Sequence, residues 1–196
     1  MYTVKKDKDE MRGVWRERRA AIDAEEKRRR DGAICRAALS LASYRYAKYV
    51  LMYAPTDEEI DVMPIALDAL SKGKGVAFPK CRPETHTMDY HFVTSPDELS
   101  AGYMGLSEPS EDAPLYDPAL LSRETLCLVP GLVYDTRGYR LGYGKGFYDR
   151  YLSSFGGNAV GIVYSDFIVP EVPKGRFDVT IKILLTEKGV VVTGEN

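Results

Sequence analysis

The chain has 196 residues, of which 44% are hydrophobic and 29% charged, and its formal net charge is −2. This length suits one domain with a sizeable core, so we expect residues 1–196 to form a single domain. The balanced charge excludes a protein whose overall field attracts nucleic acid.

The cysteines Cys35, Cys81 and Cys127 are far apart in the sequence and form no CxxC pair. Such usage is typical of a reducing, intracellular compartment. No apolar run approaches the roughly 20 residues that cross a bilayer, and the first residues lack the apolar stretch of a secretory signal. We therefore expect a cytoplasmic protein without a membrane partner.

Two helices are predicted at the start of the chain. Apolar residues recur at roughly helical spacing among charged ones, which indicates a first amphipathic helix. Asp23 and Glu26 have the spacing of a capping box and predict a second helix that runs to about Ala42. We expect most arginines of this region to lie on solvated helix faces. The apolar positions are Met11, Val14, Trp15 and Ile22 in the first helix, and Ile34, Ala37, Ala38 and Leu41 in the second.

Strands and helices then alternate. The apolar run YVLMYAP (residues 49–55) predicts a buried strand; an acidic loop, a helix and the strand VAFPK (residues 76–80) follow. Strand, helix and strand within about 30 residues form a βαβ unit, so we expect an α/β fold with a mostly parallel, Rossmann-like sheet flanked by helices. Further strands are predicted at 88–93, 125–134, 159–164, 181–186 and in the final GVVVT, with irregular chain at 95–122 and a turn at 135–138.

The stretch RLGYGKGFYDR (residues 140–150) has glycine at every second position near its centre. Glycine loses much conformational entropy on folding, so the run indicates a backbone requirement: a tight turn, or close approach of main-chain N–H groups to an anion. It follows a predicted strand and precedes a predicted helix, where open α/β sheets bind ligands. Arg140 and Lys145 favour phosphate, while a ligand-free turn stays open as the alternative.

Known nucleotide motifs do not fit this stretch. The lysine is followed by glycine rather than by serine or threonine, which excludes a P-loop, and the glycine spacing excludes GxGxxG. Asp149 could hold Mg²⁺, because this ion takes one or two carboxylates together with phosphates. The alternative for Asp149 is a surface charge beside Arg150.

Other catalytic chemistry is sparse. His86 and His91 are the only histidines, have no neighbouring cysteine or paired carboxylate, and are expected on the solvated surface. GxSxG and HExxH motifs are absent. An enzyme with this sequence would act by positioning and electrostatics, as in phosphoryl transfer.

Residues 129–152, VPGLVYDTRGYRLGYGKGFYDRYL, resemble the signature of the 5-formyltetrahydrofolate cyclo-ligase (methenyltetrahydrofolate synthetase) family, PGLxFDxxGxRLGxGxGYYDRxL. Other elements occur in the family's order, so the resemblance covers essentially the whole chain. They are KDEMR (residues 8–12), DEEID (57–61), VAFPK (76–80) and VPKGRFDVTIKILLTE (172–187).

The resemblance implies conversion of 5-formyltetrahydrofolate and ATP to 5,10-methenyltetrahydrofolate, ADP and phosphate, with Mg²⁺. ATP would phosphorylate the formyl oxygen to an iminium phosphate, N10 would attack the formyl carbon, and phosphate would leave. The expected partners are these small molecules alone, and the expected state is a monomer.

The resemblance also implies site residues. Those for ATP are Lys8, Arg12, Arg140, Leu141, Gly142, Tyr143, Gly144, Lys145, Gly146, Phe147 and Tyr148. Those for folate are Ala54, Glu59 and Tyr148, and those for Mg²⁺ are Asp149 and Asp178.

Three positions depart from the family pattern. Phe147 and Phe177 stand where tyrosine and histidine are usual, and both touch the expected active region. Lys182 stands where aspartate is usual and is expected at the surface.

Two rival functions remain at this point. One is a related ATP-dependent enzyme of cofactor metabolism on the same scaffold that lacks cyclo-ligase activity; Glu59 and Lys145 argue against it. The other is an RNA-binding module that uses the arginine-rich helices, which the net charge and the missing aromatic RNA-binding signature disfavour.

Overall fold

The structure, a computed structural model, describes residues 2–194, and side chains from residue 4 to residue 194. The helices are α1 (Tyr2–Ala20), α2 (Ala24–Ser40), α3 (Ala42–Tyr46), α4 (Met63–Ser71), α5 (Pro118–Leu121) and α6 (Phe147–Leu152), with short 3₁₀ turns at Pro96–Glu98, Tyr103–Gly105, Ser122–Glu124 and Ser165–Phe167. The strands are β1 (Tyr49–Leu51), β2 (Gly75–Arg82), β3 (Thr87–Val93), β4 (Ser100–Ala101), β5 (Ser107–Glu108), β6 (Thr125–Pro130), β7 (Val133–Asp135), β8 (Arg140–Leu141), β9 (Asn158–Ile162), β10 (Ile168–Val169), β11 (Ile183–Thr186) and β12 (Gly189–Val192).

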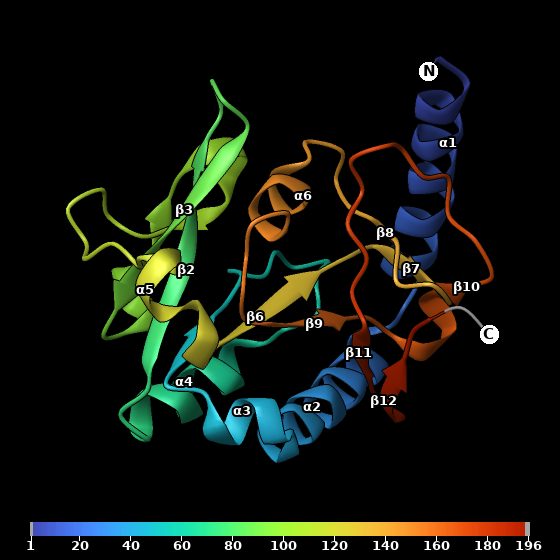
Figure 1. The fold of residues 1–196 in the computed structure, drawn as a ribbon. Helices are drawn as coiled ribbons and strands as arrows, with labels where there is room; N and C mark the ends of the chain where they lie inside the picture. The colour runs from blue at the N-terminus through green and yellow to red at the C-terminus, as the bar shows by residue number, and fades with distance from the viewer. Residues whose placement is uncertain (1, 195–196) are drawn as a thin grey trace.

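A seven-stranded sheet in the order β12-β11-β9-β6-β1-β2-β3 forms the centre of the molecule. The inner pairs β1–β2, β1–β6, β6–β9 and β9–β11 are parallel, while β3 and β12 join the two edges antiparallel. In Figure 1, α2, α3 and α4 lie along one side of this sheet, and α6 lies on the other. The predicted α/β class with a mostly parallel sheet is therefore confirmed.

Two predicted strands depart most from the structure. The run at 49–55 leaves the sheet after Leu51, because the chain turns there into the acidic loop. Met52 and Tyr53 nevertheless stay buried. The run at 125–134 is divided into β6 and β7 by a corner at Gly131. A Cβ at Gly131 would lie 2.4 Å from the Tyr134 ring, so only glycine allows this close approach.

The two N-terminal helices are confirmed. Asp23 caps α2 by accepting hydrogen bonds from the backbone N–H groups of Glu25 and Glu26, at 3.0 and 2.9 Å. The Glu26 carboxylate accepts from Arg29 instead of completing a capping box. Within the expected buried face of α2, Ile34 and Ala38 are buried.

Most arginines of these helices are exposed, as predicted, but two are buried. Arg19 and Arg30 are only 6% and 7% exposed. Arg30 is buried because it ion-pairs with Asp166 and, at 3.1 Å, with Glu187. Arg19 is buried because the end of α1 packs against the β6–β7 corner, whose carbonyl groups accept its hydrogen bonds.

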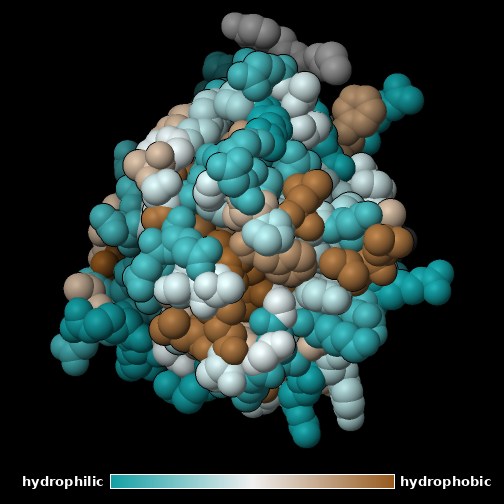
Figure 2. Space-filling model, turned by 90° about the vertical axis from the view of Figure 1, so that its left-hand side faces the viewer, coloured by the Kyte–Doolittle hydropathy of each residue, from teal (hydrophilic) through white to brown (hydrophobic). Residues whose placement is uncertain are grey.

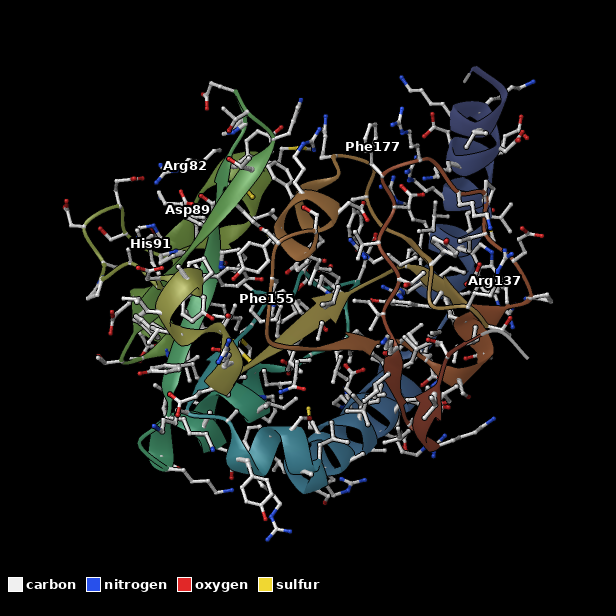
Figure 3. The ribbon with its side chains drawn as sticks, in the orientation of Figure 1. Arg82, Asp89, His91, Arg137, Phe155 and Phe177 are labelled. Atoms are coloured by element: carbon white, nitrogen blue, oxygen red, sulfur yellow. The ribbon has the colours of Figure 1, made fainter. Side chains whose placement is uncertain are left out.

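The prediction of a solvated His91 is wrong, whereas His86 is exposed as expected. His91 is 4% exposed because residues 113–116 run along the outer edge of β3 and cover it. Its Nδ1 lies 2.8 Å from the carbonyl oxygen of Ala113 (Figure 3). Figure 2 shows that hydrophobic residues gather on the face that includes this edge; exposed apolar side chains in this part of the chain are Leu115 and Leu120.

No described helix combines the length and the apolar character that a membrane span requires.

Candidate functional site

The glycine run connects β8 to α6 at the carboxyl-end side of the parallel strands (Figure 1). Gly144 and Gly146 have φ values of +97° and +73°, in the left-handed region that favours glycine. Tyr143, Gly144 and Lys145 are exposed. Their backbone N–H groups donate to no other described residue. The run can therefore offer main-chain donors to an anion.

Helix α1 lies against the glycine run through Arg12. Its Nε donates to the carbonyl oxygen of Gly142 at 2.8 Å. A Cβ at Gly144 would lie 3.1 Å from the Arg12 guanidinium carbon. The guanidinium is thereby held against a loop that follows it by 130 positions.

Lys8, one helical turn earlier on α1, forms an ion pair with Asp178 at 2.5 Å. The same oxygen of Asp178 also accepts the backbone N–H of Gly175 at 2.8 Å. Asp178 thus has a local hydrogen bond, but its charge partner is Lys8 rather than its sequence neighbour Arg176. The segment before β11 and the start of α1 meet beside the glycine run.

Arg140 and Asp149 connect the two ends of this run. Arg140 is 7% exposed and donates from Nη2 to Oδ1 of Asp149 at 3.0 Å. The same carboxylate oxygen accepts the backbone N–H of Val179 at 3.1 Å. Asp149 is therefore held by Arg140 rather than by Arg150. It also touches the residue that follows Asp178, so the two predicted magnesium ligands come from adjoining segments.

These two carboxylates suit a magnesium ion that is shared with phosphates. Mg²⁺ in nucleotide sites usually keeps several waters and takes one or two carboxylates together with phosphate oxygens. Among the described residues, no group of three or more His, Cys, Asp or Glu side chains could hold a metal by itself. The chemistry of Asp149 and Asp178 thus fits a nucleotide-bound ion, and their role as ligands stays a prediction.

Glu59 lies on the acidic loop after β1 and is 6% exposed. Its Oε2 accepts two hydrogen bonds from Thr56, at 3.0 Å from the backbone N–H and 3.2 Å from the hydroxyl. Burial raises the pKa of Glu59, and hydrogen bonds from Thr56 and Tyr143 oppose this shift. Ala54 is half-buried at the start of the same loop.

Tyr143 and Tyr148 connect the glycine run to the acidic loop. Although Tyr143 is 42% exposed as a whole residue, desolvation of its hydroxyl group, followed by the charge of Glu59, raises the pKa of Tyr143 to about 12. Burial likewise raises the pKa of Tyr148, with a smaller contribution from Glu59. The Arg140 guanidinium lies 5.9 Å from the centre of the Tyr148 ring. Tyr148 therefore interacts electrostatically with Glu59 of the predicted folate subsite and with Arg140 of the predicted ATP subsite.

The remaining predicted residues lie around the same loop. The Lys145 side chain is exposed, and Leu141 is buried in β8. Phe147 has edge-on contacts with His86 and Tyr103, at ring distances of 6.1 and 6.2 Å. The departure from tyrosine at this position thus adds to an apolar contact.

The second departure, Phe177, is 74% exposed on the segment before β11 (Figure 3). The Arg176 guanidinium lies 5.6 Å from its ring centre.

Sequence reasoning missed two residues of this region. Thr56 holds Glu59, and its T-x-x-E spacing, which is that of a capping box, could have indicated it. Tyr90 places its hydroxyl 3.5 Å from that of Tyr148. No local pattern marks Tyr90, because this contact joins β3 to α6.

A hollow of about 480 Å³ lies away from these residues, where β1 and β2 begin. Tyr49, Leu70 and Phe92 are among its lining residues, and none of its lining residues carries an acidic side chain. The charged chemistry is instead gathered around the glycine run.

Comparisons with known proteins identify the family of the chain. Residues 4–187 match the model of the 5-formyltetrahydrofolate cyclo-ligase family. The chain is 31% identical over 149 residues to a 5-formyltetrahydrofolate cyclo-ligase of Mycolicibacterium smegmatis, covering 73% of this chain and 75% of that one. It is 28% identical over 177 residues to a probable 5-formyltetrahydrofolate cyclo-ligase of Schizosaccharomyces pombe, covering 81% and 84%.

Among solved structures, 5,10-methenyltetrahydrofolate synthetase of Aquifex aeolicus superposes with a TM-score of 0.80 at 32% identity, covering 96% of this chain and 94% of that one. The family model spans the glycine run, the acidic loop and the segment that carries Asp178. The protein therefore belongs to the 5-formyltetrahydrofolate cyclo-ligase family.

Proposed function

We propose that the protein cyclises 5-formyltetrahydrofolate to 5,10-methenyltetrahydrofolate, with ATP converted to ADP and phosphate. The observation that carries this proposal is the meeting of three distant segments. Lys8 and Arg12 of α1, the glycine run and Asp178 converge through the contacts Arg12–Gly142 and Lys8–Asp178. A triphosphate requires such a set of cations and free N–H groups.

In this proposal the glycine run binds the triphosphate. The exposed N–H groups of Tyr143, Gly144 and Lys145 donate to phosphate oxygens, and Lys145 supplies a point charge. Arg12 and Arg140 add guanidinium donors from either side of the run. These donors stabilise the charge that passes from the γ-phosphoryl group to ADP.

The acidic loop binds the folate in the same proposal. The amino-pyrimidinone edge of a pterin carries N–H donors, and a carboxylate accepts them. Glu59 is buried next to Tyr148, so water competes little for this contact. Tyr148 and Ala54 complete the wall between the pterin and the nucleotide.

The reaction has two steps. The formyl oxygen of the substrate attacks the γ-phosphorus, and the bond from this phosphorus to the ADP oxygen breaks. The resulting iminium phosphate has an electrophilic carbon. The N10 lone pair attacks that carbon, N10 loses its proton, and phosphate leaves with the former formyl oxygen. No protein nucleophile is needed; the residues orient the two substrates and hold charge.

Asp149 and Asp178 are the proposed magnesium ligands, and a bound ion would neutralise phosphate charge during transfer. Asp178→Ala should raise the Mg²⁺ concentration for half-maximal rate by about tenfold or more, because one of two carboxylate ligands is lost. The exposed Asp112→Ala is the matched control. An unchanged Mg²⁺ titration would remove Asp178 from the metal site.

The test of the function follows the absorbance of methenyltetrahydrofolate after purified protein is mixed with 5-formyltetrahydrofolate. Product should form with ATP and Mg²⁺, and should not form without ATP or after chelation. Stoichiometric phosphate release ties the two substrates to one reaction.

Binding without turnover separates the rival from the proposal. A protein that binds ATP but forms no product, and shows no folate binding by calorimetry, would be the related enzyme without cyclo-ligase activity. The monomeric state and the cytoplasmic location stay predictions, which sedimentation and fractionation can test.

A further inference from the structure

Two buried charged side chains lack an ion pair among residues 4–194. Arg19 and Glu59 are each 6% exposed, and neither forms a salt bridge with a described residue. The other buried acidic and basic side chains each have a partner of opposite charge. These pairs are Arg30–Asp166, Asp31–Lys27, Glu108–Lys80, Asp135–Arg137 and Arg140–Asp149.

Backbone carbonyl groups hold the guanidinium of Arg19 in a fixed place. Its Nη2 donates to the carbonyl oxygens of Gly131 and Leu132, at 2.9 and 3.0 Å. These residues form the corner after β6, so Arg19 attaches the end of α1 to the carboxyl end of a central strand. Its buried Nε has no partner among the described residues. A buried cation is costly unless another group compensates it.

The acidic loop is the neighbouring segment of opposite charge. Arg19 lines a hollow of about 230 Å³ together with Asp57 and Glu58, the residues directly before Glu59. The hollow places the end of α1 and the acidic loop side by side.

Several groups face the Glu59 carboxylate from different elements. Thr56 comes from its own loop, Tyr53 from the chain after β1, Tyr143 from the glycine run and Tyr148 from α6. Arg19 of α1 is the cation among them. Burial raises the pKa of Glu59, and the Thr56 hydrogen bonds, the charge of Arg19 and the Tyr143 hydroxyl pull it back down.

We propose that Arg19 is a positioning residue for substrate recognition: anchored to the carbonyl groups of Gly131 and Leu132, it places a fixed positive charge beside the acidic loop and leaves the oxygens of Glu59 free for the pterin. This inference rests on the proposed folate-binding role of Glu59. A direct ion pair would place guanidinium N–H groups on the carboxylate and compete with the donors of the substrate. A cation held at a distance by Gly131 and Leu132 supplies charge and leaves the carboxylate free.

The experiment measures the dissociation constant of 5-formyltetrahydrofolate by calorimetry, without nucleotide, across the acidic pH range. Wild-type affinity should fall as pH falls, because protonated Glu59 accepts fewer N–H donors. Glu59→Gln should abolish this loss of affinity at low pH, which is the acidic limb of the curve of affinity against pH. That result assigns the limb to Glu59. Arg19→Gln keeps a side-chain donor for the carbonyl groups but removes the charge. It should move the limb to higher pH by about one unit, which is up to a tenfold loss of affinity at a fixed pH on the falling part of the curve.

Arg18→Gln is the matched control. Arg18 is the neighbouring residue of α1, its side chain is 52% exposed, and it lies 3.6 Å from Asp166 rather than near the acidic loop. Its loss should leave the limb in place. Melting temperatures of all variants show whether each one folds. Should Arg19→Gln not fold, Arg19→Lys decides, because its shorter side chain retains a displaced charge and must shift the limb upward by a smaller amount.

The outcomes separate this inference from the proposed function. An unshifted limb in folded Arg19 variants, or an equal shift in Arg18→Gln, overturns the role of Arg19 while folate binding stands. A wild-type protein that binds no folate overturns the proposed function itself.

Discussion

The glycine run and the acidic loop differ in whether their charged side chains are ion-paired and in whether they are exposed. Around the run, Lys8 is paired with a carboxylate of a distant segment and Arg140 with Asp149 at the other end of the run, while residues 143–145 are exposed. In the acidic loop, Glu59 is buried and lacks a described ion pair. A triphosphate carries enough charge to compete with existing ion pairs, whereas a neutral heterocycle needs an acceptor that is already free. The site thus has an exposed half, the glycine run, and a buried half, the acidic loop. The pairing of charges in each half matches the charge of its proposed ligand.

The largest effect is expected from Gly144→Val, which tests whether the exposed half depends on its backbone. Gly144 has a φ of +97°, and an added Cβ meets the Arg12 guanidinium at 3.1 Å. Turnover should fall by about 10² or more, since both strain and the displaced Arg12 disturb phosphate binding. Gly194→Val is the control, because Gly194 lies outside the run and a Cβ there meets nothing within 4 Å. Equal damage in both variants, measured as kcat, would contradict a specific backbone role.

Lys145→Ala removes a charge from the same half without touching the core. The side chain is exposed, so thermal melting should be unchanged while kcat falls by about 10², the usual effect of losing one preorganised donor to a transition state. Lys188→Ala, exposed in the turn between β11 and β12, should keep full activity. A fully active Lys145→Ala enzyme would leave the run as a turn without a phosphate role.

Glu59→Gln addresses the buried half. Folate binding should weaken by roughly 1.5–3 kcal/mol, the range for a hydrogen bond to a charged group, while ATP binding stays nearly intact. Calorimetry with each ligand separately measures both, and the exposed neighbour Glu58→Gln serves as control. A parallel loss of nucleotide affinity would show that the two halves are not separate subsites.

Thr56→Val should have the smallest effect and sharpens the comparison within the buried half. The substitution removes the hydroxyl that donates to Glu59 at 3.2 Å and keeps the backbone N–H that donates at 3.0 Å. One neutral donor lost from a carboxylate that retains another should weaken folate binding by about 1 kcal/mol, or about fivefold. Since valine matches the shape of threonine, melting should change little; a loss as large as that of Glu59→Gln would mean that Thr56 itself touches the substrate.

The sequence predicts the exposed half better than the buried one, for physical reasons. Within eleven residues, the alternating glycines indicate a special backbone conformation, and Arg140 and Lys145 indicate an anionic ligand. Glu59, in contrast, is one carboxylate in an acidic loop, and only the family resemblance singles it out. Nothing in the sequence separates Arg19 from the solvated arginines around it, because its partners are the carbonyl groups of Gly131 and Leu132, which carry no side-chain signature.

The fold was predicted at the level of class and element order, while element ends were not. The continuous apolar residues at 125–134 predict one strand. Its division at Gly131 depends on the Tyr134 ring that packs there. Likewise, the length of α6 is limited by Gly146, whose left-handed backbone precedes the first helical residue. Such limits come from tertiary contacts rather than from local composition.

The ion pair between Lys8 and Asp178 joins positions 170 residues apart. During synthesis the helix that carries Lys8 leaves the ribosome before the segment that carries Asp178. The proposed nucleotide site therefore cannot be completed before the segment that carries Asp178 has been made. Closure of such a long loop is the kind of contact that slows folding. Nucleotide binding would therefore mark a stage of folding at which these two distant segments have met.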